Sequence, residues 1–294
     1  MRSSDGTELA VHELGGSGPL LLLAHATGYC STAWRPVADE LSDEFRCVAF
    51  DGRAHGASAS PSPDGFSWPI LGDDVLAVLA DTDGDGDGDG DEGKIFAAGH
   101  SAGAAGIVLA ASGHPELFAG IWCFEPVLFP PAAAEGSGGP PGDGPSNPMA
   151  AAARRRRDQF SSPEEALGHF APRKPFSGFH PDALAGFVDG GLQPDPGGGF
   201  RLACRPDDEA RFYEMGGFEA TWDAPADLQV PAVFATGDQP GSFGAGHAER
   251  LAERSPSSRA EVIGGVSHFG PLERPDLVAR SIRGAFSEAL TTRL

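Results

Sequence analysis

Short apolar runs alternate with amphipathic segments along most of this chain. The longer segments repeat apolar residues every three or four positions, so that residues 31–41 place Trp34, Val37, Ala38 and Leu41 on one helical face. This alternation predicts an α/β fold with a mostly parallel sheet covered by helices on both faces. The expected strands are residues 19–24, 45–50, 94–99, 119–124, 230–236 and 260–263, and the expected helices are residues 31–41, 70–80, 104–112 and 275–290.

The N-terminal part of the pattern is short. Residues 6–14 alternate between apolar and polar positions and predict an edge strand, and the residues before them are too few for another strand of ordinary length. We therefore expect the sheet to begin at this strand, with at most a remnant of a strand outside it.

Region 127–228 departs from the strand–helix alternation. It starts with a Pro/Gly-rich stretch at residues 130–148 and continues with helical patterns. We interpret it as a helical insertion, so that residues 1–126 and 229–294 form the core. The expected helices of the insertion are residues 149–160, 163–170, 181–188 and 206–215.

The most specific chemical signal lies in residues 94–112. The β-favouring run from Lys94 breaks at Gly99-His100-Ser101-Ala102-Gly103 and continues as an Ala-rich helical segment. A Gly-x-Ser-x-Gly sequence between a strand and a helix is typical of a nucleophile elbow, in which a strained turn exposes the serine Oγ and glycines let strand and helix pass closely. Ser101 is therefore the candidate nucleophile.

Three further motifs accompany the elbow. His25-Ala26-Thr27-Gly28-Tyr29 follows an early strand, Asp51-Gly52-Arg53-Ala54-His55-Gly56-Ala57-Ser58 follows the next, and Gly264-Gly265-Val266-Ser267-His268 follows the last. In this order the four motifs resemble those of the α/β-hydrolase superfamily, in its serine-nucleophile branch of esterases and lipase-like enzymes, over nearly the whole chain. The resemblance implies an α/β-hydrolase fold in which residues 127–228 form a cap, or lid, over the active site.

A serine hydroxyl needs a base within hydrogen-bond reach, and His268, in a glycine-flanked loop after the last strand, is the best placed histidine. Two carboxylates could complete a catalytic triad. Asp238 follows the strand 230–236, the most common position in the resembled family, whereas Glu125 ends the strand 119–124, where some relatives carry a glutamate. A carboxylate at the tip of an apolar strand is costly to bury unless a partner such as a histidine N–H holds it. We therefore favour Glu125 and keep Asp238 as the alternative.

The resemblance also assigns an oxyanion hole. Its two backbone N–H donors would be those of Ala102, at the start of the elbow helix, and of Thr27. Ala26 replaces the glycine that usually follows the histidine in this loop, and its methyl group restricts the backbone conformations open to it. His25 and His55 would have structural roles in the loops that carry them.

Two features of region 127–228 are open to two interpretations. Its aromatic residues could line an acyl pocket or pack the interior of the cap, and the four arginines at residues 154–157 could bind an anion or form salt bridges. Salt bridges are favoured because four consecutive side chains on a helix point in all directions and the chain is rich in carboxylates. The aromatic residues are Phe160, Phe170, Phe176, Phe179, Phe187, Phe212 and Tyr213.

The charge balance narrows the range of partners. The chain has 42 acidic and 21 basic residues, with lysine only at positions 94 and 174, and a formal net charge of −21. Such a charge disfavours binding to nucleic acid or to an anionic membrane. A halophilic source and a GC-rich genome would both produce this composition.

Targeting segments and cofactor motifs are not evident. Apolar stretches are too short to span a bilayer, and the first residues lack the apolar core of a signal peptide, so we expect a cytoplasmic protein. The four cysteines form no close pair and predict reduced thiols, and we expect no metal or cofactor site. The Asp/Gly repeat at residues 81–93 has the spacing of a calcium-binding EF-hand loop, but a perfect repeat meets that spacing almost automatically, and a solvated surface loop is favoured.

The residue at the elbow selects the reaction class. Relatives that open epoxides or displace halide carry aspartate there, so Ser101 favours hydrolysis of a small-molecule ester, thioester or lactone through an acyl-serine intermediate. The alternatives are C–C bond hydrolysis, perhydrolysis or a lyase reaction on the same fold, and a ligand sensor with slow turnover.

Overall fold

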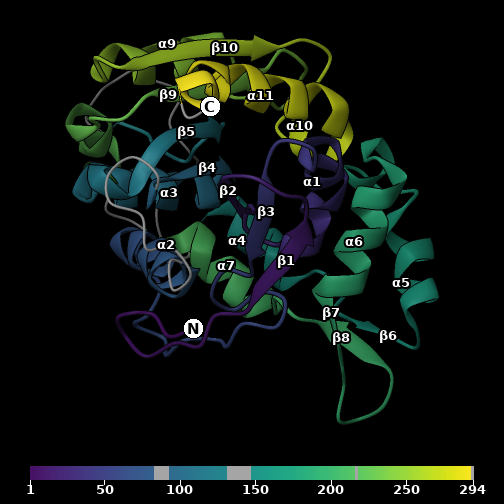
Figure 1. The fold of residues 1–294 in the computed structure, drawn as a ribbon. Coiled ribbons are helices and arrows are strands. Elements are labelled where there is room, and N and C mark those ends of the chain that lie inside the picture. Colours follow the sequence, from purple (N-terminus) through teal and green to yellow (C-terminus); the bar gives the residue numbers. More distant parts are fainter. Residues whose placement is uncertain (83–92, 131–146, 216–217, 293–294) are drawn as a thin grey trace.

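The computed structural model describes residues 1–82, 93–130, 147–215 and 218–292, and within them a seven-stranded sheet forms the centre of the molecule (Figure 1). The strand order is β1-β3-β2-β4-β5-β9-β10, in which β1 is antiparallel to β3 and the remaining neighbours are parallel. The predicted α/β fold with a mostly parallel sheet is confirmed. The strands are β1 (Val11–Gly15), β2 (Leu20–Ala24), β3 (Arg46–Phe50), β4 (Ile95–His100), β5 (Phe118–Phe124), β9 (Ala232–Gly237) and β10 (Ser258–Ile263).

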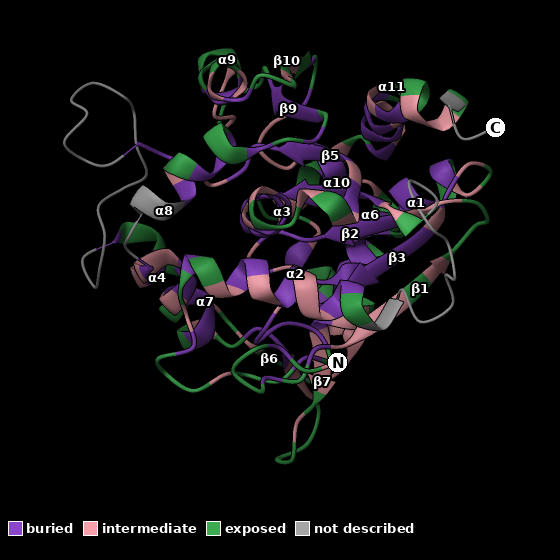
Figure 2. Cartoon of the chain, turned by 60° about the vertical axis from the view of Figure 1, so that its left-hand side comes forward, coloured by how far each residue is buried: buried purple, intermediate pink, exposed green. Residues whose placement is uncertain are grey.

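Helices cover both faces of the sheet, and the central strands are buried along most of their length (Figure 2). Successive side chains of a strand point to opposite faces, so a strand covered on both sides is apolar at every position. In β2, Leu22 packs on one face with α2, α3 and α9, whereas Leu21 and Leu23 pack on the other with α1 and α11. The core helices are η1 (Ser31–Trp34), α1 (Arg35–Leu41), α2 (Trp68–Thr82), α3 (Ala102–Gly113), η4 (Pro115–Leu117), α9 (Ala245–Arg254), α10 (Gly270–Glu273) and α11 (Pro275–Thr292).

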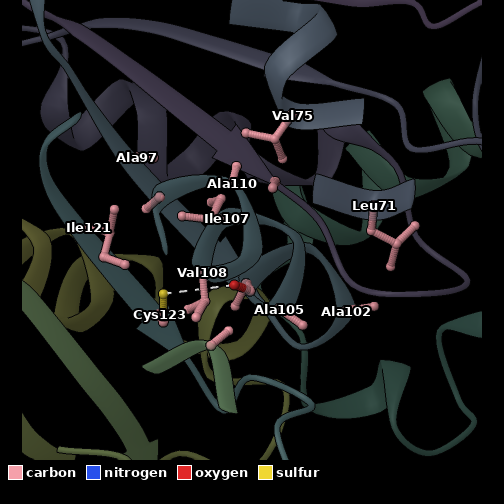
Figure 3. Close-up of a cluster of buried hydrophobic side chains, with 14 of the residues drawn as sticks. Leu71, Val75, Ala97, Ala102, Ala105, Ile107, Val108, Ala110, Ile121 and Cys123 are labelled. Carbon is pink, nitrogen blue, oxygen red and sulfur yellow. Dashed lines mark hydrogen bonds between the residues drawn. The ribbon is translucent and has the colours of Figure 1, made fainter. Parts of the chain in front are cut away.

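Small side chains let helix α3 lie close against the sheet. Figure 3 shows apolar residues of α2, β4, α3 and β5 meeting in one buried cluster, in which the Cys123 thiol donates to the carbonyl oxygen of Ala104 at 3.9 Å. The four cysteines are buried and free, as predicted. Because α3 starts directly after the elbow, this packing fixes the direction in which Ser101 is presented.

The first strand begins later than the pattern predicts. Residues 6–10 are not part of β1; instead Gly6 takes a positive φ of 85°, and a single antiparallel bridge joins Arg2 to Glu8. The turn at Asp5, whose Oδ1 accepts from the Thr7 backbone N–H at 3.0 Å, ends the extended backbone here. Beyond β1, the described N-terminal residues form only this bridge.

The region between β5 and β9 contains a small antiparallel sheet of order β6-β8-β7 in addition to helices, within residues 147–215 and 218–228 (Figure 1). The helix predicted over residues 149–160 is wrong in its second half: α4 ends at Arg154, and Gln159–Phe160 pair with β8. Strands of two or three residues have no readable period, which is why the pattern missed them. The elements are α4 (Pro148–Arg154), β6 (Gln159–Phe160), α5 (Pro163–Phe170), η5 (Phe176–Gly178), α6 (Pro181–Gly191), β7 (Leu192–Pro194), β8 (Phe200–Leu202), α7 (Pro206–Glu214), α8 (Phe218–Asp223) and η6 (Ala224–Asp227).

Three of the sequence interpretations concern the Asp/Gly repeat, a membrane span and a metal site. The Asp/Gly repeat, with its EF-hand spacing, lies almost entirely outside them. Within the described parts of the chain, no helix is long and apolar enough to cross a membrane, and no group of three or more His, Cys, Asp or Glu side chains could hold a metal ion.

Candidate active site

Ser101 occupies the sharp turn between β4 and α3. Its φ of 54° and ψ of −116° lie in a region that L-residues other than glycine rarely adopt. The turn is held on both sides, because the Ser101 N–H donates to the Phe124 carbonyl oxygen and its own carbonyl oxygen accepts from the Ala105 N–H, each at 3.0 Å. The elbow inferred from the sequence is thus a strained, well-anchored turn.

The two glycines of the elbow are required by close backbone contacts. A Cβ atom at Gly99 would lie 2.6 Å from the Ala104 Cα, and one at Gly103 would lie 2.5 Å from the His25 carbonyl oxygen. Either distance is far inside van der Waals contact, so only glycine lets the strand and the helix approach this closely. The second contact also fixes the elbow helix against the loop that starts at His25.

His268 and Glu125 form a hydrogen-bonded pair at the end of the sheet. The His268 Nδ1 lies 2.6 Å from the Glu125 Oε2, across 143 residues of sequence. Since a carboxylate can only accept, Nδ1 carries the proton, and Nε2 of the neutral ring is the basic nitrogen. The Phe243 ring stacks on the His268 ring with centroids 4.7 Å apart, which further fixes the plane of the imidazole.

Glu125 is fully buried and reaches its position through a positive φ of 44° at the end of β5. Burial by itself would raise the pKa of this carboxyl, but hydrogen bonds from His268 and from neighbouring hydroxyl and backbone groups lower the pKa to about 2. Glu125 is therefore charged across the physiological pH range. Apart from His268, the described donors are the Thr236 hydroxyl at 2.7 Å, the backbone N–H groups of Gly237 and Phe243 at 3.0 Å, and the Ser242 hydroxyl.

Asp238 has a different environment from Glu125. It is exposed, and its Oδ1 accepts from the Gly265 N–H and from the Gln239 side chain, each at 2.8 Å. These two bonds lower the pKa of its carboxyl. Asp238 holds the loop after β10 at Gly265, where φ is 85°, and makes no hydrogen bond to His268. Of the two carboxylates considered, the structure brings Glu125 and not Asp238 to the histidine.

Two buried histidines support the loop that carries Thr27. His25 Nε2 accepts from the Gly52 N–H at 2.9 Å, and His55 Nε2 accepts from the Gly28 N–H at 2.8 Å. Burial lowers the pKa of both, that of His55 to about 3, so both rings are neutral with the proton on Nδ1, which bonds a carbonyl oxygen in each case. The residue with a positive φ in this loop is Gly28, at 83°. Ala26 is not among the described residues that have a positive φ. The alanine at position 26 therefore does not have to adopt a backbone conformation that favours glycine.

His100 supports the other side of the site. It is buried at the end of β4, and its Nε2 donates to the carbonyl oxygen of His268 at 2.7 Å. Burial lowers the pKa of His100 to about 3, which keeps the ring neutral. Nothing in the sequence distinguished His100, Thr236 and Ser242 as supports of the site, because their contacts join segments that are distant in the chain.

The chain resembles a known protein family over most of its length. Residues 21–281 match the profile of the Alpha/beta hydrolase family. The chain belongs to this family.

Individual proteins are similar to the chain either in sequence over part of its length or in structure at low sequence identity. A segment of 102 residues is 33% identical to 2-(acetamidomethylene)succinate hydrolase of Mesorhizobium japonicum, and this match spans 35% of the chain but only 34% of that protein. The crystal structure of E-2-(acetamidomethylene)succinate hydrolase superposes with a TM-score of 0.74 at 23% identity, covering 98% of each chain. A thermophilic esterase from Thermogutta terrifontis, with malate bound, superposes with a TM-score of 0.69 at 22% identity, covering 97% of this chain and 96% of that one. These superpositions show a shared fold.

In this α/β-hydrolase, Ser101 and His268 line one cavity of about 970 Å³, together with Thr27 and Ala102. No hydrogen bond between the Ser101 hydroxyl and His268 occurs among the described residues. In enzymes without bound substrate such contacts are often long and shorten in the reacting complex. The four residues nonetheless face the same space, so a small molecule in the cavity could contact all of them.

The region between β5 and β9 contributes part of the lining of this cavity. Of its aromatic residues, Phe170, Phe176, Phe212 and Tyr213 line the space, whereas Phe160, Phe179 and Phe187 pack in a buried apolar cluster. The predicted salt bridges of the arginine run are confirmed for three positions: Arg154 pairs with Glu214, Arg156 with Glu209 and Arg157 with Glu165.

Proposed function

We propose that the protein hydrolyses a small-molecule carboxylic ester, thioester or lactone through an acyl-serine intermediate. The observation that carries the proposal is the pair of the strained Ser101 and the oriented His268 in one cavity. A serine hydroxyl is a weak nucleophile at neutral pH, and an imidazole whose Nδ1–H is bound to a buried, charged carboxylate is suited to accept its proton.

In the proposed reaction, His268 Nε2 takes the Ser101 hydroxyl proton while Oγ attacks the substrate carbonyl carbon. The negative charge that develops on the carbonyl oxygen is stabilised by the backbone N–H groups of Thr27 and Ala102, which both border the cavity beside Ser101. The imidazolium, stabilised by Glu125, then gives its proton to the leaving oxygen or sulfur. Water repeats the sequence on the acyl-serine and releases the acid.

In this proposal the carboxylate of the catalytic triad is Glu125 and not Asp238. The geometry of the two residues supports this choice: Glu125 bonds to His268 at 2.6 Å and is fully buried, whereas Asp238 is exposed and bonded to Gly265. A charged carboxylate inside the protein lowers the cost of forming the imidazolium far more than an exposed one, because water does not screen it.

The proposal is tested by kinetics with 4-nitrophenyl acetate and butyrate, combined with covalent labelling by a fluorophosphonate. We expect many turnovers per protein molecule, and mass spectrometry should find the label on the peptide that contains Ser101. A single stoichiometric burst without further turnover would indicate a ligand sensor instead, and labelling elsewhere or not at all would contradict the proposal.

A further inference from the structure

The lining of the cavity has the opposite charge from the chain as a whole. The chain has twice as many acidic as basic residues, 42 against 21. Among the described residues that line the cavity, however, the only carboxylate is Glu209, while five side chains are basic: Arg156, Arg157, Arg173, Lys174 and Arg250. One of the two lysines of the chain is among them. A cleft of one charge on a protein of the other concentrates ligands of opposite sign to the cleft.

Arg156 is the most buried of these five basic side chains. Its side chain is 19% exposed, and its Nη1 bonds the Glu209 Oε2 at 2.5 Å. The pair lies directly against the proposed oxyanion loop, because a Cβ atom placed on Gly28 would be 2.9 Å from the Glu209 Oε1 and 3.5 Å from the Arg156 Nη1. Gly28 follows Thr27, so the guanidinium is adjacent to the position where the substrate carbonyl would react.

The contacts of Arg156 leave most of its hydrogen-bonding capacity unused. A guanidinium has five N–H donors in one plane, and Glu209 is the only described residue that accepts from this one. Glu209 therefore fixes the guanidinium through one nitrogen, and the donors on Nε and Nη2 remain for a ligand in the cavity. The planar fork of an arginine matches the two oxygens of a carboxylate.

The other cations are suited to attract an anion. Arg173 and Lys174 are adjacent in the loop after α5, and Arg250 lies on α9; the three are exposed, and none has a carboxylate within ion-pair distance among the described residues. Exposed charges of this kind contribute little to stability but raise the local concentration of an anionic ligand.

We propose that the acyl substrate carries a second, uncleaved carboxylate, and that Arg156 binds this carboxylate through the donors that Glu209 leaves open. The proposal rests on the proposed function, because it places the carboxylate in the cavity that contains Ser101. It makes Arg156 a specificity-determining residue, Glu209 its positioning residue, and Arg173, Lys174 and Arg250 the source of the attracting field.

The test compares two substrates that differ only in charge, 4-nitrophenyl hydrogen adipate and 4-nitrophenyl methyl adipate. The wild-type protein should have a kcat/KM at least about tenfold higher for the anionic ester, and this preference should decrease as NaCl is added. Arg156→Gln, whose amide can still donate to Glu209, should reduce the preference by about 10- to 100-fold, the range expected for a lost charged hydrogen bond. Arg156→Lys, which keeps the charge but not the fork, should restore part of it.

Arg154→Gln is the matched control, since Arg154 belongs to the same arginine run but pairs with Glu214 and does not line the cavity. It should leave the preference unchanged. Equal losses on both esters in Arg156→Gln, or a wild-type preference for the neutral ester, would overturn the proposal while leaving the hydrolase function intact.

Calorimetric titration with adipate separates failure of this proposal from failure of the proposed function, because it requires no catalysis. Adipate should bind Ser101→Ala at least tenfold more tightly than the double variant Ser101→Ala/Arg156→Gln. If the protein cleaves neither ester, this difference in affinity still supports the carboxylate site, and the absence of any difference contradicts it.

Discussion

Glu125 and Arg156 are charged residues in two parts of the molecule, and they differ in how completely the protein satisfies their hydrogen-bonding groups. The carboxylate of Glu125, at the end of β5 in the core, is fully buried and accepts from His268, two hydroxyls and two backbone N–H groups. The guanidinium of Arg156, which lines the cavity from the region between β5 and β9, is partly exposed and has one described carboxylate partner. A fully bonded charge has a fixed position, whereas a partly bonded charge can still bind a ligand. From this difference we expect the core to hold the reacting groups and the region between β5 and β9 to select the substrate.

The largest effect should come from the core, at Ser101. Ser101→Ala removes only an Oγ atom that lines the cavity, so the free energy of unfolding should change little, while kcat/KM for any cleaved ester should fall by about 10³-fold or more. Steady-state kinetics and urea denaturation measure the two quantities. Activity within about tenfold of wild type would show that Ser101 is not the nucleophile.

The two carboxylates provide the next contrast. Glu125→Gln should lower kcat by about 10³- to 10⁴-fold, because an amide in the place of Oε2 would present N–H groups to His268 Nδ1 and to the Phe243 N–H, and the ring would change to the tautomer that cannot accept a proton on Nε2. Asp238→Asn, an exposed change of the same size, should alter kcat less than about threefold. Circular dichroism would establish that both variants fold. A larger loss of kcat in Asp238→Asn than in Glu125→Gln would show that Asp238 is the carboxylate of the triad.

Acid should destabilise the core, through its buried histidines, before it affects the arginine pairs of the region between β5 and β9. Burial lowers the pKa of His55 and His100 to about 3 and that of His247 to about 4, against an ordinary value of 6.5. Between these limits the unfolded chain binds protons that the folded chain does not, so stability falls as the pH decreases through 6.5 toward 3, by up to about 1.4 kcal/mol per pH unit for each histidine. Arginine stays charged throughout this range.

Urea denaturation at several pH values between 7.5 and 5 tests this pH dependence. The free energy of unfolding should fall continuously over the range, and replacing His247, whose Nε2 donates to the Pro126 carbonyl oxygen, by Gln should make the decline less steep. A flat profile in the wild-type protein would mean that these histidines do not stay neutral in the folded state.

The smallest effect is expected at Arg154, which lies in the region between β5 and β9 and does not line the cavity. Arg154 is partly exposed and bonds Glu214 through both terminal nitrogens. Arg154→Ala should lower the free energy of unfolding by less than about 1 kcal/mol, since water screens such a pair and both side chains lose conformational freedom in forming it. A thermal melt measures the change, and a loss of several kcal/mol would show that the arginine run is central to the stability of the region between β5 and β9.

The sequence by itself predicted the parts of this protein that depend on local patterns. The alternation of apolar runs and amphipathic helices gave the parallel sheet, and the elbow sequence around Ser101 gave the strained turn, because strand period, helix period and the need for glycine at close contacts are all written in neighbouring residues. The argument that an apolar strand end cannot carry a free carboxylate also pointed to Glu125 ahead of Asp238.

Tertiary structure decided what depends on contacts between distant segments. The hydroxyls of Thr236 and Ser242 reach Glu125 across more than a hundred residues, and His100 reaches the His268 carbonyl across 168, so no local pattern could reveal them. The same holds for the arginine run: four consecutive arginines predict salt bridges in general, but only the fold places Arg156 beside Gly28 and in the lining of the cavity. Local sequence determines which elements form, because backbone and side-chain preferences act over a few residues, whereas the partners of a charge are set by how those elements pack.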